Sequence, residues 1–289
     1  MTSLNDIEQF WDAHPCGESL VGREDDWRSF FERYDRYRYS TEGHILKEMD
    51  GLDLSGKDVL EIGIGQAADS AQLIARGAHW HGLDLTAEAI ARAKKRFALF
   101  DLPFMDIKQG SADSIPYPNQ TFDLVYSHGV LHHIPQIRKV SSEIRRVLKP
   151  GGLLVVMLYH KRSLNYLISI NIIRRVLMFG LAGLSVITGH TFQNNRILGG
   201  HLKNVKQFGL LPYLKNPLFM TRNTDGPENP YSKVYDLTDV AADFPDFQIV
   251  QSRVHFLNER HLLILRLFPK RLKAALESKY GWHLWVVMK

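Results

Sequence analysis

The sequence predicts an α/β fold, in which helices cover both faces of a doubly wound, mainly parallel seven-stranded sheet. Three observations support this fold. Between residues 57 and 160, short apolar runs alternate with amphipathic stretches, which is the pattern of parallel strands joined by helices. Residues 1–50 carry aromatic side chains at spacings of three and four, which predicts an N-terminal helical lid. Apolar segments within residues 161–243 predict a helical cap inserted after the fifth strand.

Composition limits the class of protein. The chain has 289 residues, 45% of them hydrophobic, and a formal net charge of +5. This is globular composition, and the mild positive excess is typical of a solvated surface, so we expect no nucleic-acid partner. The single cysteine, Cys16, excludes an internal disulfide framework and favours a reducing compartment. The first ten residues have no apolar run typical of a secretory signal, so we expect a cytoplasmic protein.

Residues 1–50 are predicted to form two or three amphipathic helices. Their aromatic side chains allow two interpretations: they pack on a core, or some of them form a lid over a ligand. In the second case Trp11, Tyr37 or Tyr39 would face the ligand.

Residues 51–160 supply the first five strands and the helices between them. The strands are predicted at Val59–Ile62, Trp80–Leu83, Phe104–Gln109, Phe122–Ser127 and Leu153–Leu158. The helices are predicted at Ala67–Ala75, Ala87–Leu99 and Gln136–Leu148, the last of which ends before Pro150 and two glycines. Because ligands of such sheets bind beyond the carboxyl ends of the strands, the residues that follow each strand are the candidates for a site.

Residues 161–243 are predicted to form the cap. Two apolar halves, Ser163–Ile173 and Val176–Thr191, are separated by two arginines, and neither reaches the roughly 20 residues of a membrane-spanning helix. Two interpretations remain open: a buried helical hairpin, or a helix at a membrane surface through residues 163–191. In the second case the cations of the cap would face anionic headgroups, namely Arg174, Arg175, Arg196, Lys203 and Lys206. Residues 221–235 are predicted to form a loop, because they are rich in Gly, Pro, Asn and Asp.

Residues 244–289 are predicted to complete the sheet. Phe247–Phe256 and Trp282–Met288 have the composition of strands. Glu259–Ser278, between them, is predicted to be a helix.

A glycine turn after the first strand is the strongest sign of a ligand. Gly63 and Gly65 lie between the apolar run and a helix, where glycine lets the backbone approach a ligand and free N–H groups attract negative groups. With Ala68 the turn fits the GxGxxG/A fingerprint, and Asp84, at the end of the next strand, can accept the hydroxyls of a ribose. Two cofactor classes fit these residues: nicotinamide dinucleotides and S-adenosylmethionine.

Glu61, two residues before the first glycine, favours S-adenosylmethionine. A carboxylate beside the turn attracts a positive amino group and a sulfonium, and it repels a pyrophosphate. Further motifs follow in order along about a hundred residues: Val59–Gly65, Gly82–Thr86, Gly110–Tyr117, Phe122–Ile134 and Val147–Leu153. With these motifs the sequence resembles the class I S-adenosylmethionine-dependent methyltransferases, and within them the ubiquinone/menaquinone C-methylase-like, type 11 group.

The resemblance implies a Rossmann-like fold and roles for single residues. Glu61, Gly63 and Gly65 would hold the methionine part of S-adenosylmethionine. Asp84 would bind the ribose, and Leu85 would lie against the adenine.

The resemblance also covers the residues after the third and fourth strands. Ala112 and Asp113 would line the adenine edge, and His128 would lie near the cofactor carboxylate and the substrate. Two positions depart from the family pattern. Ala67 replaces a third glycine, and Ser111 stands where the family often has Asp, so that Asp113 or a backbone N–H would make that contact.

Three histidines are the candidates for a general base. Methyl transfer is an in-line displacement that needs alignment and exclusion of water, and a base helps when the acceptor is a hydroxyl or an acidic carbon. Histidine has a pKa near neutrality, which makes His128, His132 and His133 the candidates. Of the adjacent pair, only one ring can point into a given pocket. No cluster has metal-ligand spacing, so no metal is expected.

The sequence therefore predicts an enzyme that moves a methyl group from S-adenosylmethionine, leaving S-adenosylhomocysteine, to a small apolar or aromatic metabolite by C- or O-methylation. A lid and a cap favour an enclosed acceptor site over a macromolecular acceptor. Two alternatives remain: a non-catalytic S-adenosylmethionine-binding domain and a nicotinamide-dependent oxidoreductase. The motifs do not distinguish carbon, oxygen and nitrogen acceptors, nor do they indicate the oligomeric state.

Overall fold

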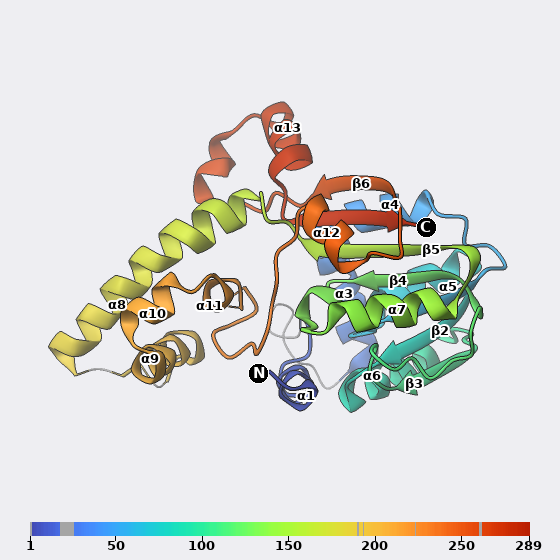
Figure 1. Ribbon diagram of the computed structural model, residues 1–289, viewed down its shortest axis with the longest axis horizontal. Coiled ribbons are helices and arrows are strands. Elements are labelled where there is room, and N and C mark those ends of the chain that lie inside the picture. The colour runs from blue at the N-terminus through green and yellow to red at the C-terminus, as the bar shows by residue number, and fades with distance from the viewer. Residues whose placement is uncertain (1, 18–25, 190, 193, 223, 260–261) are drawn as a thin grey trace. The chain divides into compact units, whose positions relative to one another are not determined.

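The computed structural model describes residues 2–17, 26–189, 191–192, 194–222, 224–259 and 262–289 (Figure 1). The chain divides into two compact units, which are described separately. The core unit comprises Ser3–Leu158, Leu237–Arg253 and Trp285–Lys289. The insertion unit comprises Tyr159–Asp236 and Val254–Leu284, together with Thr2.

Within the described residues the strands form one seven-stranded sheet in the order β3-β2-β1-β4-β5-β7-β6. Strands β1, β2, β3, β4 and β5 pair in parallel, which confirms the mainly parallel sheet that the sequence predicts. The strands are β1 (Asp58–Ile62), β2 (His79–Asp84), β3 (Asp106–Gln109), β4 (Phe122–His128), β5 (Leu148–Tyr159), β6 (Ile249–His255) and β7 (His283–Met288).

Helices of the core unit cover both faces of this sheet. In Figure 1, α7 and α12 lie in front of the strands, whereas α4 and α5 lie behind them. Apolar side chains from α4, α5 and α6 form one buried cluster with the sheet, in which Trp80 and Tyr126 are fully enclosed. The core-unit helices are α1 (Leu4–Ala13), α3 (Trp27–Thr41), α4 (His44–Asp50), α5 (Ala68–Ala75), α6 (Ala87–Phe100), the short 3-10 turn η1 (Leu131–His133), α7 (Ile137–Val147) and α12 (Leu237–Asp243).

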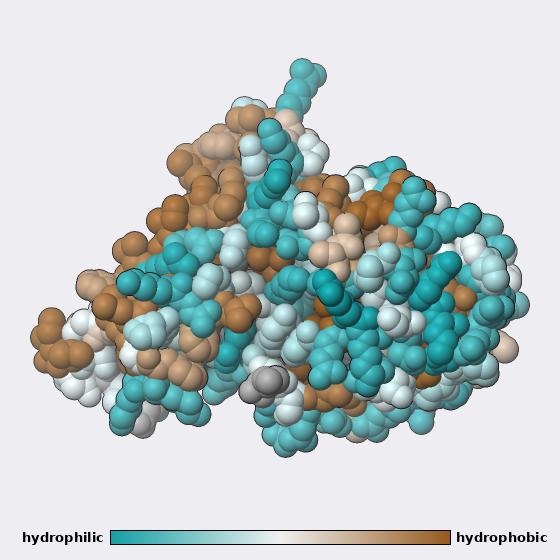
Figure 2. All heavy atoms as spheres, viewed as in Figure 1, coloured by the Kyte–Doolittle hydropathy of each residue, from teal (hydrophilic) through white to brown (hydrophobic). Residues whose placement is uncertain are grey.

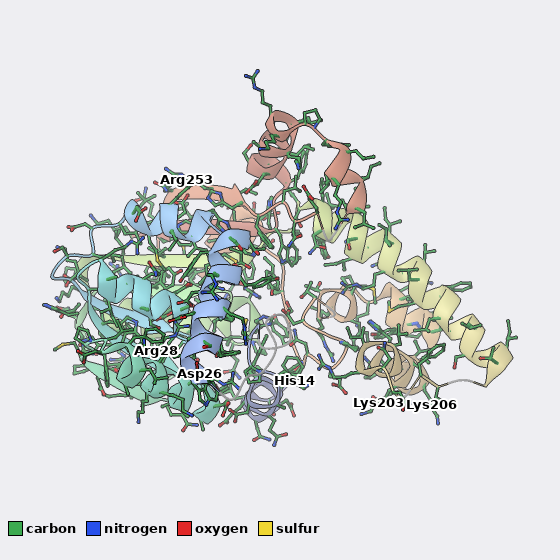
Figure 3. The ribbon with its side chains drawn as sticks, turned by 180° about the vertical axis from the view of Figure 1, so that it is seen from behind. His14, Asp26, Arg28, Lys203, Lys206 and Arg253 are labelled. Carbon is green, nitrogen blue, oxygen red and sulfur yellow. The ribbon has the colours of Figure 1, made fainter. Side chains whose placement is uncertain are left out.

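Side-chain caps fix where several of these helices begin. Asp26 accepts hydrogen bonds from the backbone N–H groups of Arg28 and Ser29, both at 3.1 Å, and so starts α3 (Figure 3). Thr86 caps α6 in the same way, so that this helix begins at Ala87, as the sequence predicts. Ser3 and Asp6 form a reciprocal capping box at α1.

The insertion unit is mainly helical and has a small core of its own. Ile170, Met178, Tyr213, Met220 and Trp282 are buried together there. Its helices are the π-helical segment η2 (Asn165–Ile173), α8 (Arg174–Thr188), α9 (Arg196–Phe208), α10 (Leu210–Lys215), α11 (Pro217–Arg222), the 3-10 segment η3 (Leu263–Leu267) and α13 (Lys270–Tyr280).

The predicted hairpin within residues 163–191 is wrong. Arg174 and Arg175 do not end a helix, because arginine is a good helix former and the backbone stays helical through Ile173 and Arg174. Segments η2 and α8 therefore form one continuous helix of 24 residues, Asn165–Thr188. By length and composition alone this helix could cross a membrane, although neither half could.

Two other predicted boundaries need correction. The helix expected at Glu259–Ser278 is divided into η3 and α13, because Pro269 has no N–H to continue a helix and stands at the start of α13. Strand β5 begins at Leu148 and runs through Pro150, five residues before the predicted start. A shift of register between Phe122 and Leu124 of β4 accommodates this extension.

Candidate active site

A pocket lies in the core unit beyond the carboxyl ends of the strands, where the sequence places the candidate site. Its walls come from α1, α3, the turn after β1, and the segments that follow β2, β3 and β4. The predicted site residues that line it are Glu61, Gly63, Gly65, Asp84, Leu85, Ala112, His128 and His133. Two others, Asp113 and His132, are not among the lining residues.

The glycine turn needs its glycines for two different reasons. Gly63 has a φ of +84°, and a Cβ there would lie 2.1 Å from Cγ2 of Val130. Gly65 has a φ of +53°, and a Cβ there would meet no atom within 4 Å. Gly63 therefore allows close packing against the segment after β4, whereas Gly65 leaves bare backbone facing the pocket.

Asp84 ends β2 and holds the glycine turn in place. Its Oδ2 accepts hydrogen bonds from the backbone N–H groups of Ile64 (2.7 Å) and Gly65 (3.3 Å). Its Oδ1 accepts from both the N–H and the hydroxyl of Thr86 (2.9 and 2.8 Å). Burial raises the pKa of the Asp84 carboxyl, and these four donors oppose that effect.

Glu61 is buried beneath the turn. Its Oε2 accepts hydrogen bonds from the hydroxyl of Ser70 (2.5 Å) and from Nε1 of Trp80 (2.8 Å). Burial, and then the neighbouring Asp69, raise the pKa of Glu61 to about 8. The carboxyl is therefore mostly protonated at neutral pH, and a cation bound nearby would favour loss of that proton.

A buried ion pair that the sequence analysis did not identify forms one wall of the pocket. Arg38, from α3, donates two hydrogen bonds to the carboxylate of Asp69, at 2.9 and 2.7 Å. The hydroxyls of Tyr39 and Tyr126 also donate to this carboxylate, each at 3.0 Å. Burial alone would raise the pKa of Asp69, but Arg38 and the donors hold it well below its usual range. Arg38 is thus a fixed positive charge beside the glycine turn.

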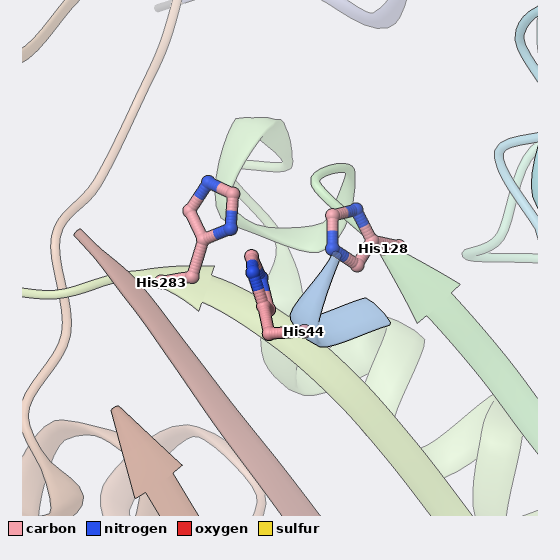
Figure 4. Close-up of side chains that lie close together, drawn as sticks. All are labelled: His44, His128 and His283. Carbon is pink, nitrogen blue, oxygen red and sulfur yellow. The ribbon is translucent and has the colours of Figure 1, made fainter. Parts of the chain in front are cut away.

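His128 ends β4 and contacts this ion pair. Figure 4 shows His128 at the end of its strand, and His44 at the start of α4. Nη2 of Arg38 donates to Nδ1 of His128 at 3.2 Å, which leaves the ring proton on Nε2 because a guanidinium only donates. Burial, and then the charge of Arg38, lower the pKa of His128 to about 3. The ring is therefore neutral at physiological pH and a weak proton acceptor.

The adjacent histidines differ in position. His133 lines the pocket, and its ring lies edge-on to that of Trp11 at 5.0 Å between centroids. His132 is fully buried, and burial lowers its pKa well below the usual value. Only one ring of the pair thus lines the pocket, as the sequence analysis expects of adjacent residues.

Asp113 has a local partner. Nζ of Lys139 lies 3.2 Å from its Oδ2, and its backbone N–H donates to the hydroxyl of Ser111 at 3.4 Å. Ser111 and Ala112, rather than Asp113, line the pocket after β3.

The N-terminal helices contribute apolar side chains to the same pocket. Leu4, Ile7 and Trp11 of α1 and Tyr34 of α3 line it. Of the three aromatic residues expected to face a ligand, Trp11 lines the pocket, Tyr37 is not among the lining residues, and the hydroxyl of Tyr39 donates to Asp69.

Sequence comparisons define the class of the core. Residues 60–156 match the family model of a methyltransferase domain. The phthiotriol/phenolphthiotriol dimycocerosates methyltransferase of Mycobacterium tuberculosis (strain ATCC 25177 / H37Ra) is 36% identical over 103 residues, which cover 35% of this chain and 37% of that protein. The fatty-acid O-methyltransferase of Mycolicibacterium smegmatis is 35% identical over 102 residues, which cover 35% of this chain and 36% of that protein. The chain thus spans little more than a third of the length of these curated relatives.

A solved structure extends the likeness of fold to nearly the whole chain. The (4+2)-cyclase SpnF aligns with 99% of this chain and 96% of its own, with a TM-score of 0.57 and 16% sequence identity. At this identity the likeness shows the fold alone, and that protein is by its name a cyclase.

The fold and the matched motifs are those of a class I S-adenosylmethionine-dependent methyltransferase. Residues 60–156, about a third of the chain, match the methyltransferase domain family. The resemblance inferred from the motifs is confirmed.

Proposed function

We propose that this protein transfers a methyl group from S-adenosylmethionine to a small lipophilic metabolite, by C- or O-methylation. The observation that carries the proposal is one pocket lined by the glycine turn, Glu61, Asp84 and Arg38. The turn offers exposed backbone, Glu61 and Asp84 offer buried carboxyl groups, and Arg38 offers a positive charge. Together these groups suit a ligand that has a ribose, an amino group and a carboxylate. The sequence alternatives, a non-catalytic binding domain and a nicotinamide oxidoreductase, have no support among the relatives.

Each residue has a defined task in this proposal. Asp84 would exchange part of its hydrogen bonding to the turn for the ribose hydroxyls. Glu61 would lose its proton and attract the amino group, and Arg38 would attract the carboxylate. Leu85 and Ala112 would supply apolar contacts to the adenine, with Asp113 acting at its edge through Ser111. The cofactor supplies an electrophilic methyl group on a positive sulfur when bound, and no metal is required.

The histidines divide by environment. His128 is a weak proton acceptor because of its low pKa, so we propose that its task is to orient Arg38. His132 is enclosed and supports the fold of η1. His133 lines the pocket beside Trp11, and it is the residue that we propose as general base when the acceptor is a hydroxyl.

The acceptor is proposed to be lipophilic for two reasons. Apolar side chains of α1 line the pocket next to His133, which favours an apolar acceptor over a charged one. The two relatives named above act, by their names, on phthiotriol/phenolphthiotriol dimycocerosates and on a fatty acid.

Calorimetric titration tests the cofactor. We expect S-adenosylmethionine and S-adenosylhomocysteine to bind and NADH not to bind. Asp84→Ala should weaken binding at least about tenfold, through loss of charge-assisted hydrogen bonds. Asp53→Asn, an exposed acid of the same unit, is the matched control. Unchanged affinity in Asp84→Ala, with an unchanged melting temperature, would exclude Asp84 from the ribose site.

Transfer of a labelled methyl group to fatty acids, phenols and quinones tests the activity. His133→Ala should lower kcat by about 10²–10⁴ if the ring is the base, with cofactor affinity retained. Binding of the cofactor without transfer to any of these acceptors would favour the non-catalytic alternative.

A further inference from the structure

Few residues of the continuous helix Asn165–Thr188 are buried. They are Asn165, Ile170, Met178 and Ala182, and Arg174 is half-buried. Ile170 and Met178 pack in the core of the insertion unit with Tyr213. One side of the helix is therefore held by the protein.

The remaining surface of this helix is apolar and exposed. Val186 and Ile187 each keep 84% of their surface exposed. A helix on the surface of a soluble protein normally turns polar side chains to water. The other exposed apolar residues of the helix are Leu167, Ile172, Ile173, Val176, Leu177, Phe179 and Leu184.

The neighbouring segment η3 continues the same kind of surface. Leu262 and Leu265 are buried, and they line a small hollow together with Leu164 and Asn165 at the start of the long helix. The intervening side chains point outward, and Leu267 is 82% exposed. Figure 2 shows these apolar residues as a brown edge of the insertion unit. We call this surface the apolar ridge: the exposed apolar residues of Asn165–Thr188 with Leu263, Ile264 and Leu267.

Cations stand beside the apolar ridge. Arg266 lies within η3, and Lys270 and Arg271 begin α13; all three are exposed. Glu259 lies 3.9 Å from Arg266, and it also pairs with Lys273 at 2.6 Å. The segment therefore presents apolar side chains and net positive charge together.

We propose that the apolar ridge binds the surface of a bilayer that carries anionic lipids, with the long helix lying in the membrane plane. Apolar side chains of such a helix enter the boundary between headgroups and acyl chains, and adjacent cations attract anionic headgroups. The sequence predicts other cations for the headgroup contacts. Of these, Arg174 and Arg175 are half-buried, whereas Arg196, Lys203 and Lys206 are exposed on α9, which packs against α8 (Figure 3). The proposal adds the cations of η3 and α13.

Two other modes of covering the apolar ridge fit less well. Spanning the membrane would carry Arg174 and Arg175 to the middle of the hydrocarbon and would pull Met178 out of its buried contacts. A symmetric dimer through the apolar ridge would bring the same cations of two copies together, which is unfavourable.

Flotation of the full chain with vesicles tests the proposal. We expect binding to vesicles of phosphatidylcholine with about 30% phosphatidylglycerol, which supplies an anionic surface. Binding to vesicles of phosphatidylcholine alone should be weaker. Val176→Glu with Ile187→Glu should weaken binding at least about tenfold, since two exposed apolar contacts are replaced by anions. Met105→Glu, an exposed apolar position in the core unit, is the matched control and should bind normally.

A charge variant and two further measurements complete the test. Lys270→Gln with Arg271→Gln should remove the preference for anionic vesicles while the far-UV spectrum and the melting temperature stay unchanged. Release of bound protein by alkaline carbonate supports the in-plane helix, and resistance overturns it in favour of a span. Absence of vesicle binding by the wild-type chain overturns the proposal. A dimer in sedimentation that Val176→Glu with Ile187→Glu dissociates would overturn it in favour of a second copy.

Discussion

Helices α7 and α8, of the core and insertion units, expose opposite kinds of side chain. Helix α7 buries Ile137, Val140 and Ile144 and turns arginine and lysine outward. Helix α8 buries Met178 and Ala182 and turns valine, leucine and isoleucine outward. Both follow a helical period, but only α7 has the usual contrast between its two faces.

The difference shows that the two units place their apolar surface differently. In the core unit apolar side chains enclose a sheet, and the buried carboxylate of Asp69 is paired with Arg38. In the insertion unit much of the apolar surface stays on the outside, where it adds nothing to folding stability and is available for a partner. We therefore expect the core unit to be sensitive to single substitutions and the surface of the insertion unit to be tolerant of them.

The largest expected effect concerns the buried ion pair. Asp69→Ala removes the carboxylate that accepts two hydrogen bonds from Arg38 and leaves that charge the more distant Glu42, at 3.6 Å, so it should lower the free energy of unfolding by about 3–5 kcal/mol. In the insertion unit, Glu228→Ala removes a half-exposed partner of Arg196 at 3.6 Å and should change it by less than about 1 kcal/mol. Urea unfolding of both variants measures the contrast, and equal effects would contradict the distinction between the units.

A pair of glycine substitutions sharpens the comparison. Gly63→Ala places a Cβ against Val130 at a positive φ, so we expect a loss of about 2–3 kcal/mol. Gly183→Ala, in the middle of α8, meets no atom within 4 Å and should raise stability by about 0.5–1 kcal/mol through helix propensity. Scanning calorimetry gives the sign of each change. A destabilised Gly183→Ala would mean that the exposed face of α8 is covered by a contact in the free protein.

A third contrast between the two units is their pH dependence. Glu61 has a raised pKa of about 8, so its contribution to stability is fully present below its unfolded pKa and is lost as pH rises through 8. Burial, and then the charge of Arg174, lower the pKa of His201 in the insertion unit to about 4, so its contribution is present above about 6.5 and is lost as pH falls. Each slope is at most about 1.4 kcal/mol per pH unit.

Glu61→Gln and His201→Gln separate these two slopes. The first variant should remove the fall in stability between about pH 4.5 and 8, and the second should remove the rise between about pH 4 and 6.5. Melting temperatures measured across pH 4–8 test both. A Glu61→Gln variant with the wild-type slope would show that Glu61 is ionised in the folded protein.

Much of the core unit was predictable because its signals are local. Apolar runs mark β1 and β4, and glycines mark the turn between β1 and α5. Asp84 was predicted as a site residue from its spacing to the turn, and the structure places it on the pocket wall. The ion pair of Arg38 with Asp69 was missed because 31 residues separate the partners and no local pattern joins them. The position of Asp69 in the first turn of α5, four residues after Gly65, was the available signal.

The insertion unit was harder to predict for a physical reason. Two arginines within an apolar run suggest that the helix ends there, yet a helix tolerates charged residues. Only the packing of Arg174 decides on which side of the helix the two arginines lie. The sequence pattern also does not predict that an apolar helix face is exposed, because apolar residues are usually interpreted as buried. Only Pro269, which lacks an N–H, offered a local sign of the division between η3 and α13.

The place of β7 in the sheet has a consequence for folding during synthesis. This strand follows every other strand in the chain, yet it lies between β5 and β6, and all six of its residues are buried. The edge of β5 that receives it therefore stays open until residue 288 has left the ribosome. During that interval the nascent chain exposes both an unpaired strand edge and an apolar helix that has already emerged. Both surfaces favour aggregation, so binding of a chaperone or of a nearby lipid surface would protect the chain most at this stage.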